Sequence, residues 1–327
     1  MAVPRRAFVQ LGAAALATVA FEHPMGLAQS PYPSRPVRII VGFPGGGVSD
    51  ITARLIGQSL SAQFGQPFII ENRPGATTNL ATEAVVKAPG DGYTLLLATM
   101  INAVNATAFS NLNFDFIRDI APVASIIDVP LIMEVNPSIP ATTLPEFVAY
   151  AKAHPGKINY ASVGIGSPNN VAGELFKMMA DVDITHVPYR GSSAVLADLI
   201  SGQVQVGFDP VVPSIDLIEA GKLRALAVTS TARLNVLPDV PTVSEFLPGF
   251  EVSAWQGLGA PKSTPTAIID TINRHVQVAL GDSELTAKLV ELGAVLLPGS
   301  PADFADRIAR DTEKWANVVR FAGIRAD

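Results

Sequence analysis

Short apolar runs alternate with helical patterns along most of this chain, and this alternation limits the fold more than any other feature. The run VRIIVGF at residues 37–43 is followed by a helical pattern from Asp50 to Phe64, with apolar residues about one turn apart. The alternation restarts after Pro137 and continues through INYASV and ITHVPY to LRALAVTS. Strands that alternate with helices are typical of parallel sheets covered by helices on both faces.

The last part of the chain has a different pattern. After the extended run FEVSAWQGLGAP, three helices follow without strong strands between them. A helical tail with no sheet of its own is expected to pack back on the first domain, so that the chain crosses between domains near residues 131 and 252. We therefore predict an α/β fold of two lobes, each a mostly parallel sheet flanked by helices, with a cleft between them. Lobe 1 is predicted to comprise residues 29–130 plus 253–327, and lobe 2 residues 131–252.

The first residues have the pattern of an export signal. Arg5 and Arg6 precede an apolar run at 11–21 that is too short to span a bilayer, and Gly26 and Ala28 are small residues at signal-peptidase spacing. We predict a signal peptide at 1–28, cleaved near Ala28, and a periplasmic location in a Gram-negative source. RRAFVQ also fits a twin-arginine signal, so the general and twin-arginine export routes both stay open.

Composition excludes several classes of function. The chain has no cysteine, which excludes disulfides, thiolate metal sites, a catalytic thiol and a lipidated cysteine. Its net charge of -6 argues against nucleic acid as a partner. His154, His186 and His275 are scattered, and no Ser-His-Asp pattern is evident. We therefore predict no metal, no cofactor and no catalytic residue, and expect a soluble monomer.

The segment GFPGGGVSD at 42–50 joins the first strand to the first helix. Backbone N–H groups and the helix dipole favour an anion at such a helix start. The segment lacks the Lys-Ser/Thr pair of a nucleotide P-loop, and Asp50 stands where a dinucleotide motif needs glycine. Asp50 is interpreted as a first-turn charge or cap. The segment thus indicates an anion site rather than a nucleotide site, with a purely structural turn as the alternative.

Further loops follow other predicted strands and share a composition rich in Gly, Ser, Thr and Asn. Such loops offer N–H and hydroxyl donors, which suit carboxylate recognition rather than chemical turnover. They are ENRPGATTN (71–79), ATMINAVN (98–105), ASVGIGSPNN (161–170), VPYRGSSA (187–194) and FDP (208–210).

These segments together resemble the substrate-binding component of the tripartite tricarboxylate transporters, the Bug family of periplasmic receptors. ENRPGA, DGYTLLL, HVPYRGS and LRALAVTS carry the resemblance, which covers nearly the whole mature chain. It implies a two-lobed Venus-flytrap fold of the type II-like periplasmic binding protein class. It also implies a receptor that captures a small organic acid and delivers it to the large and small membrane subunits of a transporter. The acid is expected to be a di- or tricarboxylate, an aromatic carboxylate or an acidic amino acid.

The resemblance also implies which residues bind the ligand. They are Phe43, Pro44, Gly45 and Gly46 in the first loop, Ala76 and Thr77 in the second, Thr99 and Asn102 in the third, Ser162, Gly166, Ser167 and Asn170 in the second lobe, and Asp209 after a second-lobe strand. The family more often has glycine at Thr77 and Thr78. It commonly has His at Asn170 and Asn at Pro210, and MINAVN replaces a stretch that is often Gly/Ser-Thr-His. These departures concern the identity of the ligand rather than the fold.

Several alternatives stay open at the level of sequence. Arg73 and Arg190 each either clamp a carboxylate or maintain loop structure, and Trp255 either stacks on an aromatic acid or packs in the core or hinge. The chain could also act as a sensor that passes ligand-bound closure to a signalling protein, or as an exported enzyme on the same scaffold.

Overall fold

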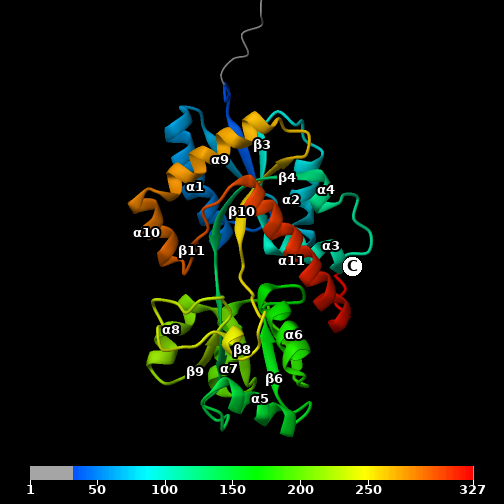
Figure 1. Ribbon diagram of the computed structural model, residues 1–327, viewed down its shortest axis with the longest axis vertical. Coiled ribbons are helices and arrows are strands. Elements are labelled where there is room, and N and C mark those ends of the chain that lie inside the picture. Colours follow the sequence, from blue (N-terminus) through cyan, green and yellow to red (C-terminus); the bar gives the residue numbers. More distant parts are fainter. Residues whose placement is uncertain (1–31, 327) are drawn as a thin grey trace, which may run out of the picture. The chain divides into compact units, whose positions relative to one another are not determined.

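The structure, a computed structural model, describes residues 32–326, so the predicted signal peptide at 1–28 lies outside the described residues. Within the described part, the chain forms two separate sheets flanked by helices (Figure 1). Across residues 32–326, no helix is both long enough and apolar enough to span a membrane.

The first sheet has six strands in the order β11-β4-β10-β3-β1-β2. β1 pairs in parallel with β2 and β3, whereas β10 pairs antiparallel with β3 and β4. Its strands are β1 (Val37–Val41), β2 (Phe68–Asn72), β3 (Thr94–Thr99), β4 (Ile120–Asp128), β10 (Gln256–Pro261) and β11 (Val295–Leu296).

The second sheet has five strands in the order β7-β6-β8-β5-β9. β6 pairs in parallel with β7 and β8, whereas β5 pairs antiparallel with β8 and β9. Its strands are β5 (Leu131–Val135), β6 (Asn159–Ser162), β7 (Thr185–Pro188), β8 (Val206–Pro210) and β9 (Arg224–Val228).

The α/β fold class is confirmed, and each sheet, predicted to be mostly parallel, is a mixed sheet with both parallel and antiparallel pairs. Most strands of each sheet run in one direction, whereas β10 and β11 in the first sheet and β5 in the second run the opposite way. β5 and β10 are the strands that follow the two crossings between the sheets. Each enters its sheet at the end where the neighbouring strands finish, so it runs antiparallel to them. The alternation of strands and helices in the sequence does not reveal these three reversed strands. The lobe boundaries near 131 and 252 stay predictions.

Eleven α-helices and two short 3-10 turns connect the strands of the described part. They are α1 (Val48–Phe64), η1 (Ala76–Thr78), α2 (Asn79–Val86), α3 (Met100–Ala108), α4 (Phe116–Asp119), α5 (Leu144–Ala153), α6 (Pro168–Ala180), α7 (Ser192–Ser201), α8 (Val211–Glu219), η2 (Val243–Glu245), α9 (Thr266–Leu280), α10 (Ser283–Glu291) and α11 (Pro301–Ala322).

Alternate residues of a strand face different helical layers, as the period of a strand requires. Ile39 and Val41 of β1 share an apolar cluster with α1 and α9, whereas Ile40 belongs to a cluster with α2, α3 and α11. Helices therefore cover both faces of the first sheet. In the second sheet, α5 and α6 pack on one face and α7 and α8 on the other.

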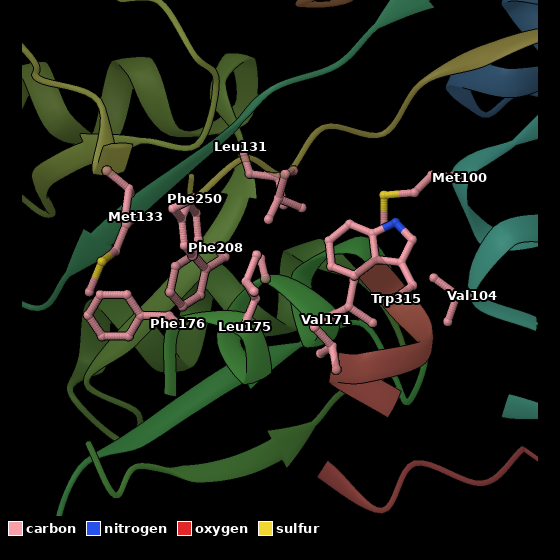
Figure 2. Close-up of a cluster of buried hydrophobic side chains, with 14 of the residues drawn as sticks. Met100, Val104, Leu131, Met133, Val171, Leu175, Phe176, Phe208, Phe250 and Trp315 are labelled. Atoms are coloured by element: carbon pink, nitrogen blue, oxygen red, sulfur yellow. The ribbon is translucent and has the colours of Figure 1, made fainter. Parts of the chain in front are cut away.

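One apolar cluster extends through elements of both sheets. Figure 2 shows Trp315 of α11 between Met100 and Val104 of α3 and Val171 of α6. The Trp315 side chain is fully buried. The C-terminal helix therefore packs against β4 and α3 and also against α6, which precedes β7 of the second sheet.

Candidate functional site

A cavity of about 430 Å³ is lined by elements that belong to both sheets. This volume lies in the range of small-molecule sites. Its lining residues are Phe43, Ser49, Thr77, Thr99, Met100, Ile101, Val163, Ile165, Ser167, Pro168, Ala254, Trp255 and Gln256. None of them carries a charge, so any recognition of an anion here depends on neutral donors and helix dipoles.

Three helices begin at this cavity. Ser49 lies in the first turn of α1, Thr99 and Met100 begin α3, and Ser167 and Pro168 begin α6. The first N–H groups of a helix have no partner inside that helix, and the helix dipole places partial positive charge there. Three such ends around one cavity make it a favourable environment for an anion.

The glycine loop before α1 is held by Asp50. Asp50 Oδ2 accepts hydrogen bonds from Gly46 N and from Arg54 Nε, each at 2.9 Å, and Asp50 Oδ1 accepts one from Asn72 Nδ2 at 2.9 Å. The hydrogen bond from Arg54, helped by those from Gly46 and Asn72, lowers the pKa of Asp50 to about 2. Asp50 therefore shapes the loop and does not line the cavity, in agreement with the interpretation of Asp50 as a first-turn charge.

The start of α3 is fixed by a capping box. Thr99 N donates to Asn102 Oδ1 at 2.8 Å, and the Thr99 side chain accepts from the backbone of Asn102 in return. Asn102 Nδ2 donates to the hydroxyls of Thr78 and Thr82 at 3.1 and 2.9 Å. Asn102 is buried and does not line the cavity, so its side chain joins α3 to the second loop.

That second loop has an unusual backbone. Ala76, Thr77 and Thr78 have φ angles of 44°, 50° and 75°, so three consecutive residues other than glycine adopt the left-handed region. Such a conformation costs roughly 1 to 3 kcal/mol for each residue and persists where neighbouring groups impose it. Asn105 Nδ2 donates to Thr77 O at 2.5 Å, and Asn102 binds Thr78. Two asparagines of α3 thus hold the loop that presents Thr77 to the cavity.

The start of α6 is held by a buried polar network. Ser167 caps the helix by accepting from Asn170 N at 3.3 Å, and its hydroxyl donates to Gly164 O at 2.6 Å. Asn170 Oδ1 accepts from Gly166 N at 2.9 Å, and Asn170 Nδ2 donates to the Tyr160 hydroxyl at 2.9 Å. Asn170 is buried beneath the loop and supports it.

Ser162 and His186 form a pair that sequence reasoning did not connect. Ser162 Oγ lies 2.6 Å from His186 Nε2, and Ser162 Oγ also accepts from Gly164 N at 3.1 Å. The Ser162 side chain is fully buried, and burial lowers the pKa of His186. The Ser162 hydroxyl bonds to His186 and Gly164 and does not line the cavity. Because a nucleophile must contact its substrate, Ser162 is not placed to attack a ligand in this cavity.

Asp209 lies on β8 of the second sheet, next to a second buried acid. Asp209 Oδ1 accepts from Asn169 Nδ2 at 2.9 Å, while Asp209 Oδ2 has no partner among the described residues. Glu134 on neighbouring β5 accepts from Ser214 Oγ at 3.0 Å. Burial raises the pKa of Asp209 to about 7, and burial together with the nearby Asp209 carboxyl raises that of Glu134 to about 8. Asp209 does not line the cavity.

Trp255 connects the cavity to the segments that cross between the sheets. It lines the cavity, is fully buried, and its Nε1 donates to Asp311 Oδ2 of α11 at 2.6 Å. Arg307, one turn earlier on α11, forms ion pairs with Asp128 at 3.3 Å and with Glu251 at 3.1 Å. Asp128 ends β4 and Glu251 precedes β10, so one helix binds both crossing segments. Trp255 therefore packs among the crossing segments and also faces the cavity, so stacking on an aromatic acid and packing at the hinge both stay predictions.

The structure brings together four of the predicted ligand residues, namely Phe43, Thr77, Thr99 and Ser167, as lining of one cavity. The other nine lie outside that lining and stay predictions; they are Pro44, Gly45, Gly46, Ala76, Asn102, Ser162, Gly166, Asn170 and Asp209. Arg73 and Arg190 do not line it either, and Arg73 forms an ion pair with Glu71 at 2.6 Å.

Sequence reasoning missed other residues of the cavity. They are Ser49, Met100, Ile101, Val163, Ile165, Pro168, Ala254 and Gln256. The position of Met100, Ile101 and Pro168 at predicted helix starts is a signal that could have found them. Gln256 has no such signal, because only the pairing of β10 with β3 brings it opposite Thr99. Among the residues that the structure describes, no group of three or more His, Asp or Glu is arranged to hold a metal ion.

Comparisons with known proteins agree with this architecture. The model of the tripartite tricarboxylate transporter family receptor matches residues 52–324. Protein BugT of Bordetella pertussis is 35% identical over 297 residues, which cover 90% of this chain and 91% of BugT.

Two solved structures are also similar. The structure of R. palustris Rpa4515 with adipate has 39% identity and a TM-score of 0.75, covering 90% of this chain and 99% of that one. The structure of MatC (Rpa3494) from Rhodopseudomonas palustris with bound malate has 34% identity and a TM-score of 0.73, covering 88% of this chain and 100% of that one.

Proposed function

The chain belongs to the family of tripartite tricarboxylate transporter receptors, and we propose that it binds a small organic acid in the cavity between its two sheets. The family consists of periplasmic solute-binding receptors that bind small organic acids and work with tripartite transporters. Family membership therefore favours a transport receptor over a sensor or an exported enzyme.

One observation carries the assignment of the ligand class. The starts of α1, α3 and α6 meet at one cavity whose lining has no charged side chain. A carboxylate is stabilised at a helix N-terminus without a countercharge, and its oxygens accept several neutral hydrogen bonds at once. Two similar structures hold dicarboxylates, adipate and malate, which supports a dicarboxylate for this chain.

The site that we propose has direct and supporting residues. Phe43, Thr77, Thr99 and Ser167 line the cavity and are proposed to contact the acid or the water around it. Asn102, Asn170 and Ser162 support the loops that these residues occupy. The remaining predicted residues, Pro44, Gly45, Gly46, Ala76, Gly166 and Asp209, are proposed to shape the loops or the sheet beneath them.

The partners and the location form part of the same proposal. We propose that the chain is exported by a signal peptide at 1–28, acts as a monomer without catalytic activity, and delivers its ligand to a large and a small membrane subunit. Two lobes, 29–130 plus 253–327 and 131–252, are proposed to close on the acid. Family membership supports delivery to a tripartite transporter, and a cavity lined by loops of both sheets supports closure of two lobes.

A thermal-shift screen tests the proposed function. The purified mature protein is heated with di-, tri- and aromatic carboxylates and acidic amino acids, and the melting temperature is recorded for each. A ligand at one hundred times its dissociation constant adds about 2.7 kcal/mol to stability. We expect at least one acid to raise the melting temperature clearly. An absence of any shift across all these acids would contradict the proposed ligand class.

The amide of the best acid provides the matched control. Amidation keeps the size of the ligand but removes its charge, so the helix starts would face a weaker acceptor. We expect calorimetry to show an affinity for the amide at least about tenfold lower, which corresponds to about 1.4 kcal/mol. Equal affinities would show that the cavity does not recognise a carboxylate.

A further inference from the structure

Gln256 at the start of β10 is a buried polar residue of the cavity whose side-chain carbonyl oxygen is unpaired. Only 5% of the residue is exposed, and it lines the cavity. Its Oε1 atom is buried and has no hydrogen-bond partner within residues 32–326. Buried side-chain polar atoms are paired in the large majority of cases, and this unpaired atom belongs to a residue of the cavity wall, where a ligand can supply a partner.

The backbone of Gln256 is firmly placed. Gln256 lies opposite Thr99 on β3 and opposite Ile127 on β4, so strands on both sides hold it. Directly opposite residues in an antiparallel pair project to the same face of the sheet. The Gln256 amide therefore lies beside Thr99, at the start of α3, where the proposed function places a carboxylate.

Neighbouring hydroxyls of the cavity are already occupied. The Thr99 side chain caps α3, and the Ser167 hydroxyl donates to Gly164 O at 2.6 Å. Neither hydroxyl bonds to Gln256, and a carboxylate cannot satisfy a carbonyl oxygen because a carboxylate has no proton to donate. A hydrogen-bond donor on the ligand could supply the missing partner of Gln256 Oε1.

We propose that Gln256 is a ligand-binding residue that recognises a hydroxyl group on the carbon next to the ligand carboxylate. Gln256 Oε1 accepts from this hydroxyl, and Nε2 of the same amide donates to the adjacent carboxylate. A 2-hydroxy acid presents this donor and acceptor side by side, which matches the side-by-side acceptor and donor of an amide. The inference rests on the proposed function and makes the ligand class narrower, to 2-hydroxycarboxylic acids.

Three pairs of acids test this inference, because the members of each pair differ by one hydroxyl: malate and succinate, 2-hydroxyadipate and adipate, mandelate and phenylacetate. Calorimetry measures each affinity for the wild type, for Gln256→Met and for Gln58→Met, which replaces an exposed glutamine on α1. We expect the wild type and Gln58→Met to prefer the hydroxy acid at least about tenfold in every pair that binds, because an unpaired polar group in the site disfavours the analogue without the hydroxyl. We expect Gln256→Met to bind both members of a pair equally.

The melting temperature without ligand provides a second readout. Methionine has a similar length and leaves no buried polar atom unpaired, so Gln256→Met should melt at or above the temperature of the wild type. A structural role for the amide would instead lower the melting temperature of this variant, and that result would overturn the inference.

The outcomes separate the inference from the proposed function. If the wild type binds acids without preferring the hydroxyl, or if Gln256→Met keeps the preference, the inference is overturned while the proposed function stands. If the wild type binds none of these six acids and none in the wider screen, both are overturned together.

Discussion

At the scale of single residues, the buried acids Glu134 and Asp209 make stability depend on pH. Both are fully buried in the second sheet, and each has one carboxyl oxygen without a partner among the described residues. Glu134 has a pKa of about 8 in the folded protein, far above the ordinary value of a glutamate, because burial and the nearby Asp209 disfavour its charge. In the unfolded chain the same group ionises near pH 4, so the folded state loses stability as the pH rises from about 4 to about 8.

Replacing Glu134 with glutamine removes this loss. Glu134→Gln has the same shape and no charge, so its stability advantage over the wild type should grow by about 2 to 3 kcal/mol between pH 5 and pH 8. Urea unfolding at the two pH values measures this change. Glu219→Gln, an exposed change at the end of α8, serves as the control and should shift stability by less than about 0.5 kcal/mol. A difference between wild type and Glu134→Gln that does not vary with pH would show that Glu134 is not buried as a neutral acid.

At the scale of elements, helix α11 connects the cavity with the crossing segments. Asp311 accepts from Trp255 Nε1 at 2.6 Å and forms an ion pair with Lys314 at 2.9 Å, while Arg307 binds Asp128 and Glu251. The Asp311 side chain is only 5% exposed. Loss of its carboxylate would therefore leave the Trp255 N–H and the Lys314 ammonium without this partner.

We expect Asp311→Ala to lower the free energy of unfolding by about 2 to 4 kcal/mol and to weaken acid binding, because the change frees Trp255 at the cavity wall. Asp306→Ala replaces an exposed aspartate on the same helix and should change neither property by more than about 0.5 kcal/mol. Denaturant unfolding and calorimetry on both variants provide the measurement. Equal effects of the two substitutions would rule out a special role for the Trp255–Asp311 contact.

At the scale of the whole molecule, residues of both proposed lobes line the cavity. Thr77 and Thr99 come from the first sheet's loops, and Ser167 and Pro168 from the loop after β6 of the second sheet. A ligand can close the lobes only through contacts that it makes in the closed state and lacks in the open state. A shift from mostly open to mostly closed needs roughly 5 kcal/mol of such differential binding.

A dicarboxylate that binds tightly should therefore lower the radius of gyration measured by small-angle scattering. A shorter acid with one carboxylate should bind weakly and close the lobes poorly, because it reaches only one set of donors. The amide of the tight ligand serves as the negative control. An unchanged radius of gyration at saturation with a tight ligand would mean that the lobes are already locked together.

The sequence by itself determined the alternating α/β architecture, the helical tail and the loops at which helices begin. These features follow from the spacing of apolar residues, from glycines and from helix-capping residues. All of these signals depend only on residues that are close together in the sequence. The family resemblance added the receptor class, and four of its ligand residues line the cavity: Phe43, Thr77, Thr99 and Ser167. These residues came from the resemblance and not from local pattern, although Thr99 and Ser167 also lie directly before helices.

Only the tertiary structure decided which polar residues face the cavity and which support it from beneath. Asn102, Asn170 and Asp209 are buried, bind residues of other elements and do not line the cavity, and their contact with a ligand stays a prediction. Gln256 has no distinguishing pattern of its own and becomes a site residue only because β10 runs antiparallel between β3 and β4. Whether a buried polar side chain has a hydrogen-bond partner depends on residues that are far away in the chain. The pattern of neighbouring residues in the sequence does not contain this information.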